Sequence, residues 1–172
     1  MNKRFLSVAL VVGISVLLVS AGLYAGTEVK DVIQMENKAY KERKESTPTF
    51  THKKHAVEYA EKHPDLYPNG CGDCHHEEKD GKSVPLKELK EGDEVKNCIE
   101  CHKKPGYIKS KEAKKMGLTD KQEREYHANA MHDNCQECHK IFNKKMGLKS
   151  KDKDYAPTKS KCKTCHPKNK KK

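Results

Sequence analysis

The sequence is short of the side chains from which a globular protein usually builds its interior. It contains no tryptophan, three phenylalanines and seven tyrosines, and hydrophobic residues make up only 34% of the 172. Seventeen of them lie in residues 1–25. The remainder is too poor in apolar residues to form a core from side chains alone. Eight cysteines and ten histidines argue against simple disorder, so disulfides, metal ions or a large cofactor are expected to complete the interior.

Acidic residues are also scarce relative to basic ones. Lysine and arginine number 36 against 25 acidic residues, which gives a formal net charge of +11. The basic residues are spread along the chain, arginine is rare beyond the N-terminus, and most aromatic residues are not interleaved with basic clusters, so nucleic-acid binding is not expected. The surplus of positive charge indicates a solvated lysine-rich surface or a docking face for an acidic partner.

Long hydrophobic runs are absent except at the N-terminus. A short basic start precedes the apolar run Phe5–Val19, and small residues follow it. This layout predicts a signal peptide over residues 1–25, cleaved after Ala25 or, as second choice, after Gly22. An uncleaved anchor is the alternative, and only then would the protein contact the membrane. We expect the rest of the chain to be periplasmic; it could also be anchored in the inner membrane facing the periplasm, or extracellular.

No cysteine lies outside one repeated pattern, C-x-x-C-H. This is the attachment motif of c-type haem, in which two thiols bind the porphyrin edge and the following histidine ligates the iron. A structural zinc site or four disulfides are alternatives, but neither requires a histidine after each second cysteine. The four motifs therefore predict four covalently bound haem c groups, attached through Cys71 and Cys74, Cys98 and Cys101, Cys135 and Cys138, and Cys162 and Cys165.

Histidines outnumber the motifs. The motifs supply the proximal ligands His75, His102, His139 and His166. Six further histidines remain, which are His52, His55, His63, His76, His127 and His132. Because four irons could each take one of them, two histidine ligands per iron are favoured. Methionine is the rival ligand, and Met131 is its foremost candidate, although methionine more often fills gaps in a core.

Local geometry limits how some of these histidines can be used. His76 follows the proximal His75, and adjacent side chains leave the backbone in different directions, so His76 is expected to reach another iron. His52 and His55 are three residues apart at the start of a predicted helix through Ala60, and they share a helix face. His63 precedes a proline, which favours a position outside the helix and makes it the weaker ligand candidate.

Beyond the motifs, the chain resembles the tetrahaem class III cytochromes c from Phe50 to Pro167. The resemblance rests on the order of the four motifs and on three short patterns, Phe50-x-His52-x-x-His55, Cys71-Gly72-Asp73-Cys74-His75-His76 and Ala130-Met131-His132-Asp133. It implies that the proximal histidines of the first to fourth motifs are paired as His75 with His52, His102 with His76, His139 with His55, and His166 with His132. Family members often have four residues between the cysteines of the second and fourth motifs, whereas here every motif has two. His132 also lies unusually close to Cys135, which leaves His127 as an alternative for the fourth iron.

The predicted organisation is a mainly α-helical fold with long loops and little or no strand, wrapped around four haems. Residues 26–49 form an N-terminal extension with a short helix over Asp31–Glu45, residues 50–167 form the tetrahaem domain, and residues 168–172 form a basic tail. Two short strands near Phe50 are an alternative. Further helices are expected over Ser110–Met116 and over Thr119–His132, which begins with a capping box. Glu77–Asn97 is expected to be mostly loop, with a turn at Pro85–Lys90 as an option, and Lys144–Ser160 is expected to be a polar loop.

Iron held by two histidines has no open position for a substrate, so we predict an electron-transfer protein of low potential and not an enzyme. The resemblance implies a periplasmic carrier of anaerobic respiration. Its partners would be redox proteins with acidic docking faces, such as a hydrogenase, a dehydrogenase or a membrane cytochrome complex. The alternatives are a subunit of an extracellular or membrane-tethered haem wire and, less favoured, a multihaem reductase.

Overall fold

The structure is a computed structural model, and it describes residues 29–167. The chain divides into two compact units, residues 1–29 with 90–94 and residues 30–89 with 95–172. The described part of the first unit is a turn, in which the Lys90 N–H donates to Asp93 Oδ2 (2.7 Å). The predicted signal peptide and basic tail lie outside the described residues. Within residues 29–167, no helix is both long enough and apolar enough to cross a bilayer.

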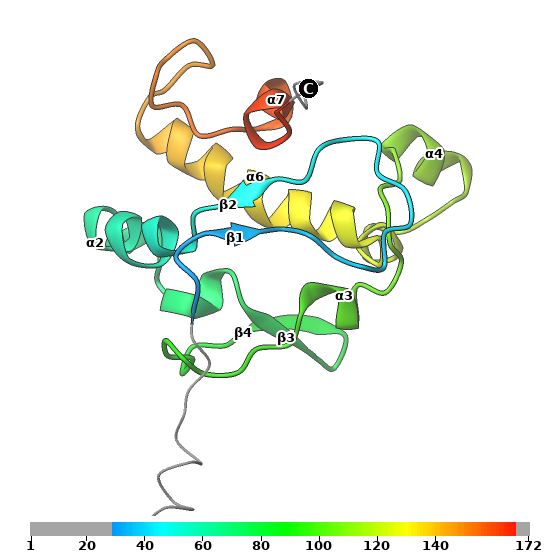
Figure 1. Cartoon of the computed structure of the whole chain (residues 1–172), viewed down its shortest axis with the longest axis horizontal. Helices are drawn as coiled ribbons and strands as arrows, with labels where there is room; N and C mark the ends of the chain where they lie inside the picture. Colours follow the sequence, from blue (N-terminus) through cyan, green and yellow to red (C-terminus); the bar gives the residue numbers. More distant parts are fainter. Residues whose placement is uncertain (1–28, 168–172) are drawn as a thin grey trace, which may run out of the picture. The chain divides into compact units, whose positions relative to one another are not determined.

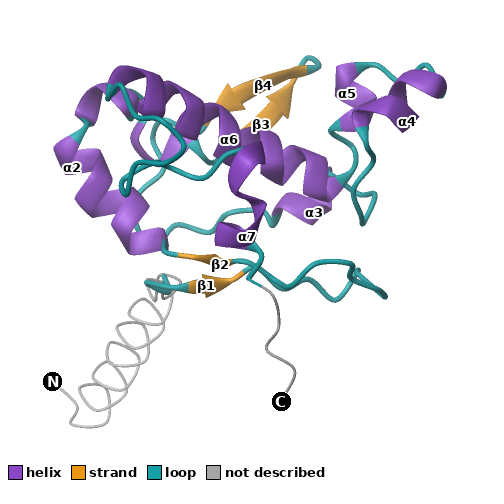
Figure 2. Cartoon of the chain, turned by 90° about the horizontal axis from the view of Figure 1, so that it is seen from above, coloured by secondary structure: helices purple, strands orange, loops and turns teal. Residues whose placement is uncertain are grey.

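The second unit contains every C-x-x-C-H motif, and its elements are short apart from one helix (Figure 1). The strands are β1 (Ile33–Gln34), β2 (Thr49–Phe50), β3 (His76–Lys79) and β4 (Lys82–Pro85). The α-helices are α2 (Ala60–Lys62), α3 (Cys98–Cys101), α4 (Ser110–Lys115), α5 (Asp120–Glu123), α6 (His127–Lys145) and α7 (Cys162–Cys165). A π-helix, η1 (Lys54–Tyr59), and three 3₁₀ turns, η2 (Pro64–Leu66), η3 (Gly70–Asp73) and η4 (Lys159–Lys161), complete the unit. The prediction of a mainly helical and loop-rich fold is confirmed, with two small sheets added (Figure 2).

The prediction of a helix over Asp31–Glu45 is wrong. Residues 29–49 contain no helix, and β1 pairs antiparallel with β2 in the register Ile33 with Phe50 and Gln34 with Thr49. The apolar stripe in this segment is weak, and the β-branched and aromatic side chains of the two strands suit a ladder better than a helix. The alternative of two short strands near Phe50 therefore describes this region.

The loop predicted over Glu77–Asn97 begins instead as a hairpin. Strands β3 and β4 pair antiparallel, with His76 opposite Pro85 and Lys79 opposite Lys82. Asp80 and Gly81 connect them with φ angles of 51° and 75°, which suits the primed turns of tight hairpins. Most of the hairpin is exposed, so its sequence lacks the alternation of apolar and polar residues that would have predicted strands.

The helices after residue 109 follow the prediction with one break. Helix α4 and the capping box at Thr119 are confirmed. The helix predicted over Thr119–His132 stops after α5, because the Lys104 N–H donates to Glu125 O (2.9 Å) and the His127 N–H donates to Lys104 O (2.8 Å). This bridge draws the backbone out of the helix. Helix α6 then begins at His127 and extends to Lys145, past the predicted start of the Lys144–Ser160 loop.

Side chains contribute little to the interior of the described residues. Only three hydrophobic side chains are buried, Ile108, Ala113 and Ala130. Two asparagines of α6 are buried as well, and each makes two hydrogen bonds of 2.9 Å with the backbone of another segment, Asn129 with Ile108 and Asn143 with Ala156. Helix α6 therefore holds two loops through pairs of hydrogen bonds made by its asparagine side chains. The scarcity of buried apolar side chains among the described residues agrees with the composition.

Candidate functional site

Each C-x-x-C-H motif lies on a helical turn. We number the motifs in chain order: site one is Cys71–His75, which starts on η3; site two is Cys98–His102, formed by α3 and the residue after it; site three is Cys135–His139 within α6; and site four is Cys162–His166, formed by α7 and the residue after it. Positions i, i+3 and i+4 share a face of a helix, so each turn presents both thiols and the histidine on one side. All eight cysteines are unpaired thiols.

The structure brings each of these histidines close to a second histidine from a different segment. The ring centroids are 6.5 Å apart for His52 and His75, 6.1 Å for His76 and His102, 6.3 Å for His55 and His139, and 6.0 Å for His132 and His166. These are the four pairs that the family resemblance implies. An imidazole nitrogen lies about 2.0–2.1 Å from a bound metal such as zinc, so two rings that face one ion have centroids roughly 6 Å apart.

The histidines occur in facing pairs and not in larger clusters. Across residues 29–167, no group of three or more histidine, cysteine or acidic side chains is arranged to hold a bare metal ion. Each site combines the two thiols of its motif with a pair of imidazoles, a donor set that fits a haem c group with two histidine ligands.

Burial favours the neutral form of several of these rings. It lowers the pKa of His55, His75 and His76, and the charges of neighbouring histidines lower it further. The pKa of His132 is lowered in the same way, first by burial and then by His166. A neutral imidazole is the form that binds a metal, so these rings are prepared for ligation.

Backbone carbonyl groups orient four of the eight paired rings. In each case the ring Nδ1–H donates to a carbonyl oxygen. The acceptors are Thr51 O for His55 (2.8 Å), Arg124 O for His102 (2.6 Å), Pro157 O for His139 (2.7 Å) and Ser46 O for His166 (2.7 Å). With Nδ1 occupied, Nε2 is the nitrogen left for a metal, and the hydrogen bond raises the basicity of the ring.

Site one is built differently from the other sites. The rings of His52 and His75 have no hydrogen bond among the described residues, but the turn itself is closely packed. A Cβ atom on Gly72 would lie only 2.8 Å from the carbonyl carbon of Leu86, and the Leu86 N–H donates to His75 O (3.0 Å). Asp73 further braces the turn by accepting hydrogen bonds from the backbone and side-chain nitrogens of Asn69.

Cysteines of different sites lie close enough to influence one another. Burial raises the pKa of Cys74 to about 11, and the nearby Cys135 and Cys138 add to the rise. Burial likewise raises the pKa of Cys135 to about 11, with contributions from Cys165 and Cys98. Cys135 therefore has neighbours from sites one, two and four, and the attachment turns converge around the middle of α6.

The two remaining histidines, His63 and His127, do not belong to any of the four facing pairs. His63 packs edge-on against Phe142, with centroids 5.3 Å apart, and lies outside the helix with φ −136°, as its position before a proline predicts. The ring of His127 forms a hydrogen bond of 2.7 Å with Tyr40 Oη. Of the two candidates for the fourth iron, it is His132 and not His127 that faces His166.

Several residues of the sites could not be found by sequence reasoning. The carbonyl groups of Ser46, Arg124 and Pro157 leave no signal, because every residue has one. Two aromatic neighbours of the histidines were also missed, Tyr59 beside His55 and Tyr107 beside His132, each with ring centroids 5.3 Å apart.

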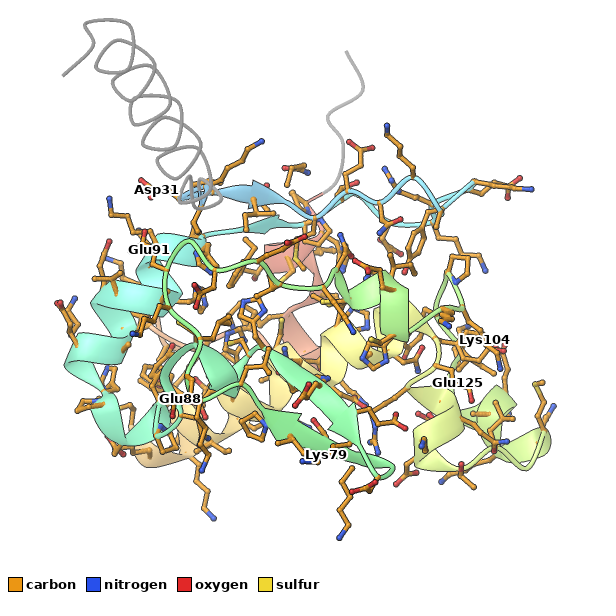
Figure 3. All side chains as sticks on the ribbon, turned by 90° about the horizontal axis from the view of Figure 1, so that it is seen from below. Asp31, Lys79, Glu88, Glu91, Lys104 and Glu125 are labelled. Atoms are coloured by element: carbon orange, nitrogen blue, oxygen red, sulfur yellow. The ribbon has the colours of Figure 1, made fainter. Side chains whose placement is uncertain are left out.

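A salt bridge of 2.6 Å between Lys104 and Glu125 flanks the backbone bridge near site two (Figure 3).

Repeated haem-attachment turns, each facing a second histidine, define a multihaem c-type cytochrome. The sequence model of the class III cytochrome c family matches residues 28–166, and the chain belongs to this family. Its members are electron carriers that hold haem covalently. No curated protein and no solved structure is significantly similar to the chain.

Proposed function

We propose that the chain carries electrons through four haem c groups, one at each site. Cys71, Cys74, Cys98, Cys101, Cys135, Cys138, Cys162 and Cys165 would attach them. The iron ligands would be His75 and His52 at site one, His102 and His76 at site two, His139 and His55 at site three, and His166 and His132 at site four. The observation that carries this proposal is the set of four histidine pairs with centroids 6.0–6.5 Å apart.

Two histidine ligands on each iron favour electron transfer over catalysis. Haem iron with this ligation is six-coordinate, exchanges single electrons and lacks the methionine that would raise its potential. The polypeptide contributes the ring orientations, through the carbonyl groups of Thr51, Arg124, Pro157 and Ser46. No side chain needs to contact a substrate for this function.

Short rigid segments would couple neighbouring sites. Sites one and two share the adjacent residues His75 and His76, and sites one and three share the continuous helical stretch 52–62, which carries His52 and His55. Sites three and four share α6, on which His132 and His139 lie seven residues apart, about 10.5 Å along the axis. These shared segments would keep neighbouring haems close enough to exchange electrons.

Mass spectrometry of the purified native protein tests the cofactor content. Each haem adds roughly 616 Da, so four haems are expected on the intact chain, and the same mass reports whether residues 1–25 have been removed. A visible spectrum typical of low-spin iron should accompany them. A mass with fewer than four haems would contradict the proposal for the site that lacks one.

We further propose a periplasmic location and an acidic redox partner, such as a hydrogenase, a dehydrogenase or a membrane cytochrome complex. Without Lys3 and Arg4 of the predicted signal peptide, 34 basic residues stand against 25 acidic ones. This net charge of +9 and the exposed Lys159, Lys161 and Lys163 around site four support the docking mode. Association with such a partner should slow as salt is added, because screening weakens attraction between exposed charges. An association rate that stays constant from low to high ionic strength would rule the docking mode out.

A further inference from the structure

The segment between the first two strands contacts site four although it is far from it in sequence. We call residues 35–48 the strap. Its ends are joined by the pairing of β1 with β2, and the Met35 N–H donates to Pro48 O (3.0 Å). Ser46 in the strap accepts the hydrogen bond from His166 Nδ1, across 120 positions of the sequence.

Two side chains hold the strap in shape. Arg43 Nη1 donates to Glu36 Oε1 (2.7 Å) and to Thr47 Oγ1 (3.3 Å), while Arg43 Nη2 donates to Asn37 O (2.9 Å). Gln34 Nε2 donates to Thr47 O (3.0 Å), directly after Ser46. Gln34 and Arg43 therefore both bond to Thr47, the residue that follows the Ser46 carbonyl.

The strap is also tied to the start of α6 and borders an open cavity beside the histidine. Tyr40, near the middle of the strap, bonds to His127 at the first position of α6. Strap residues and His166 line a cavity of about 750 Å³. Ser46 Oγ is buried and has no hydrogen-bond partner among the described residues, as expected where a further polar group completes the site.

We propose that the strap sets the reduction potential of the haem at site four, with Gln34 and Arg43 as positioning residues. This inference rests on the proposed function. The carbonyl of Ser46 makes the ring of His166 more basic, and a more basic ligand stabilises ferric iron and lowers the potential. If Gln34 or Arg43 is lost, the carbonyl moves and the potential of site four rises.

The test uses two variants of the full haem-loaded protein that leave the charge near site four unchanged. Gln34→Ala removes a neutral side chain, and Arg43→Lys keeps the positive charge while removing the planar fork. This choice is needed because deleting a positive charge near the iron would itself lower the potential and hide the effect.

Two measurements are made on each variant and on the double variant. Spectroelectrochemistry gives the four midpoint potentials, and NMR of ¹⁵N-histidine-labelled protein gives the exchange rate of the His166 Nδ1 proton. In the double variant we expect about a tenfold rise in the ferrous-to-ferric ratio at site four at a fixed applied potential, equivalent to 59 mV for one electron. The His166 proton should exchange faster, and the other three potentials should stay unchanged.

Gln122→Ala is the matched control, since it removes an equivalent side chain from the capping box of α5 and should change neither measurement. If the protein holds four haems but both variants keep all four wild-type potentials, the strap has no positioning role and the proposed function stands. If wild-type protein lacks a haem on Cys162 and Cys165, the proposed function fails at site four and this inference fails with it.

Discussion

Sites one and three use the same motif but hold their histidines in opposite ways. At site three both rings donate to carbonyl groups, His55 to Thr51 O and His139 to Pro157 O. At site one neither ring has such a bond among the described residues, and the bracing is instead in the attachment turn, where Leu86 lies against Gly72. One site is organised through its ligands and the other through its backbone.

The difference in hydrogen bonding between sites one and three should change their reduction potentials. Hydrogen bonds to both ligands make them more basic and favour ferric iron, so site three should have a lower potential than site one. Sites two and four, with one such bond each, should lie between them. Similar motifs can thus give at least three different potentials without any change of ligand.

The largest expected effect comes from replacing the histidine ligand that lies outside the C-x-x-C-H motif, at site three and at site one. His55→Met and His52→Met should each raise one midpoint potential by on the order of 0.2 V, within the roughly 0.8 V that axial ligands span. The rise should be larger for His55→Met, because that variant also removes the bond to Thr51 O. Spectroelectrochemical titration measures both, and equal rises would show that the carbonyl bond has no influence.

A second prediction concerns the backbone of site one. Gly72→Ala places a Cβ atom 2.8–3.0 Å from three backbone atoms of Leu86, which cannot move aside as a side-chain tip could. We expect a loss of about 3 kcal/mol in the free energy of unfolding. The matched change at site three, Gln136→Ala, removes an amide whose Oε1 is buried without a partner, and should cost little. Denaturant titration of the two haem-loaded variants measures both free energies of unfolding. Equal losses of stability would contradict the proposed difference between the sites.

The smallest effect is expected where α6 holds the carbonyl of site three. Asn143→Ala leaves the N–H and C=O of Ala156 without their partner, at a cost of about 2 kcal/mol. Because Pro157 follows directly, the potential of site three should also rise slightly. Asn129→Ala removes the equivalent pair of bonds to Ile108 and should lower stability similarly without moving that potential. Calorimetry and redox titration together would separate the two effects.

Local patterns were the features that sequence reasoning predicted well. The capping box at Thr119 and the exit of the chain at His63 depend on neighbouring residues only, and both were confirmed. The helix predicted over Asp31–Glu45 was wrong, because β1 pairs with β2 across the strap. The segment Glu77–Asn97, predicted to be mostly loop, is loop after Pro85, but its first part pairs as β3 and β4 in an exposed hairpin. Neither pairing has a strong periodic signal in its own residues.

The amino-acid sequence by itself determined the chemistry of the sites: eight thiols in four turns, each followed by a histidine, in a chain with too few apolar residues for a core of its own. Attachment motifs are local, so spacing alone reveals them. Only the tertiary structure decided which carbonyl group each ring meets, and that His166 is held by Ser46 from the far end of the chain. A carbonyl group is common to every residue, so its role depends entirely on where the fold places it.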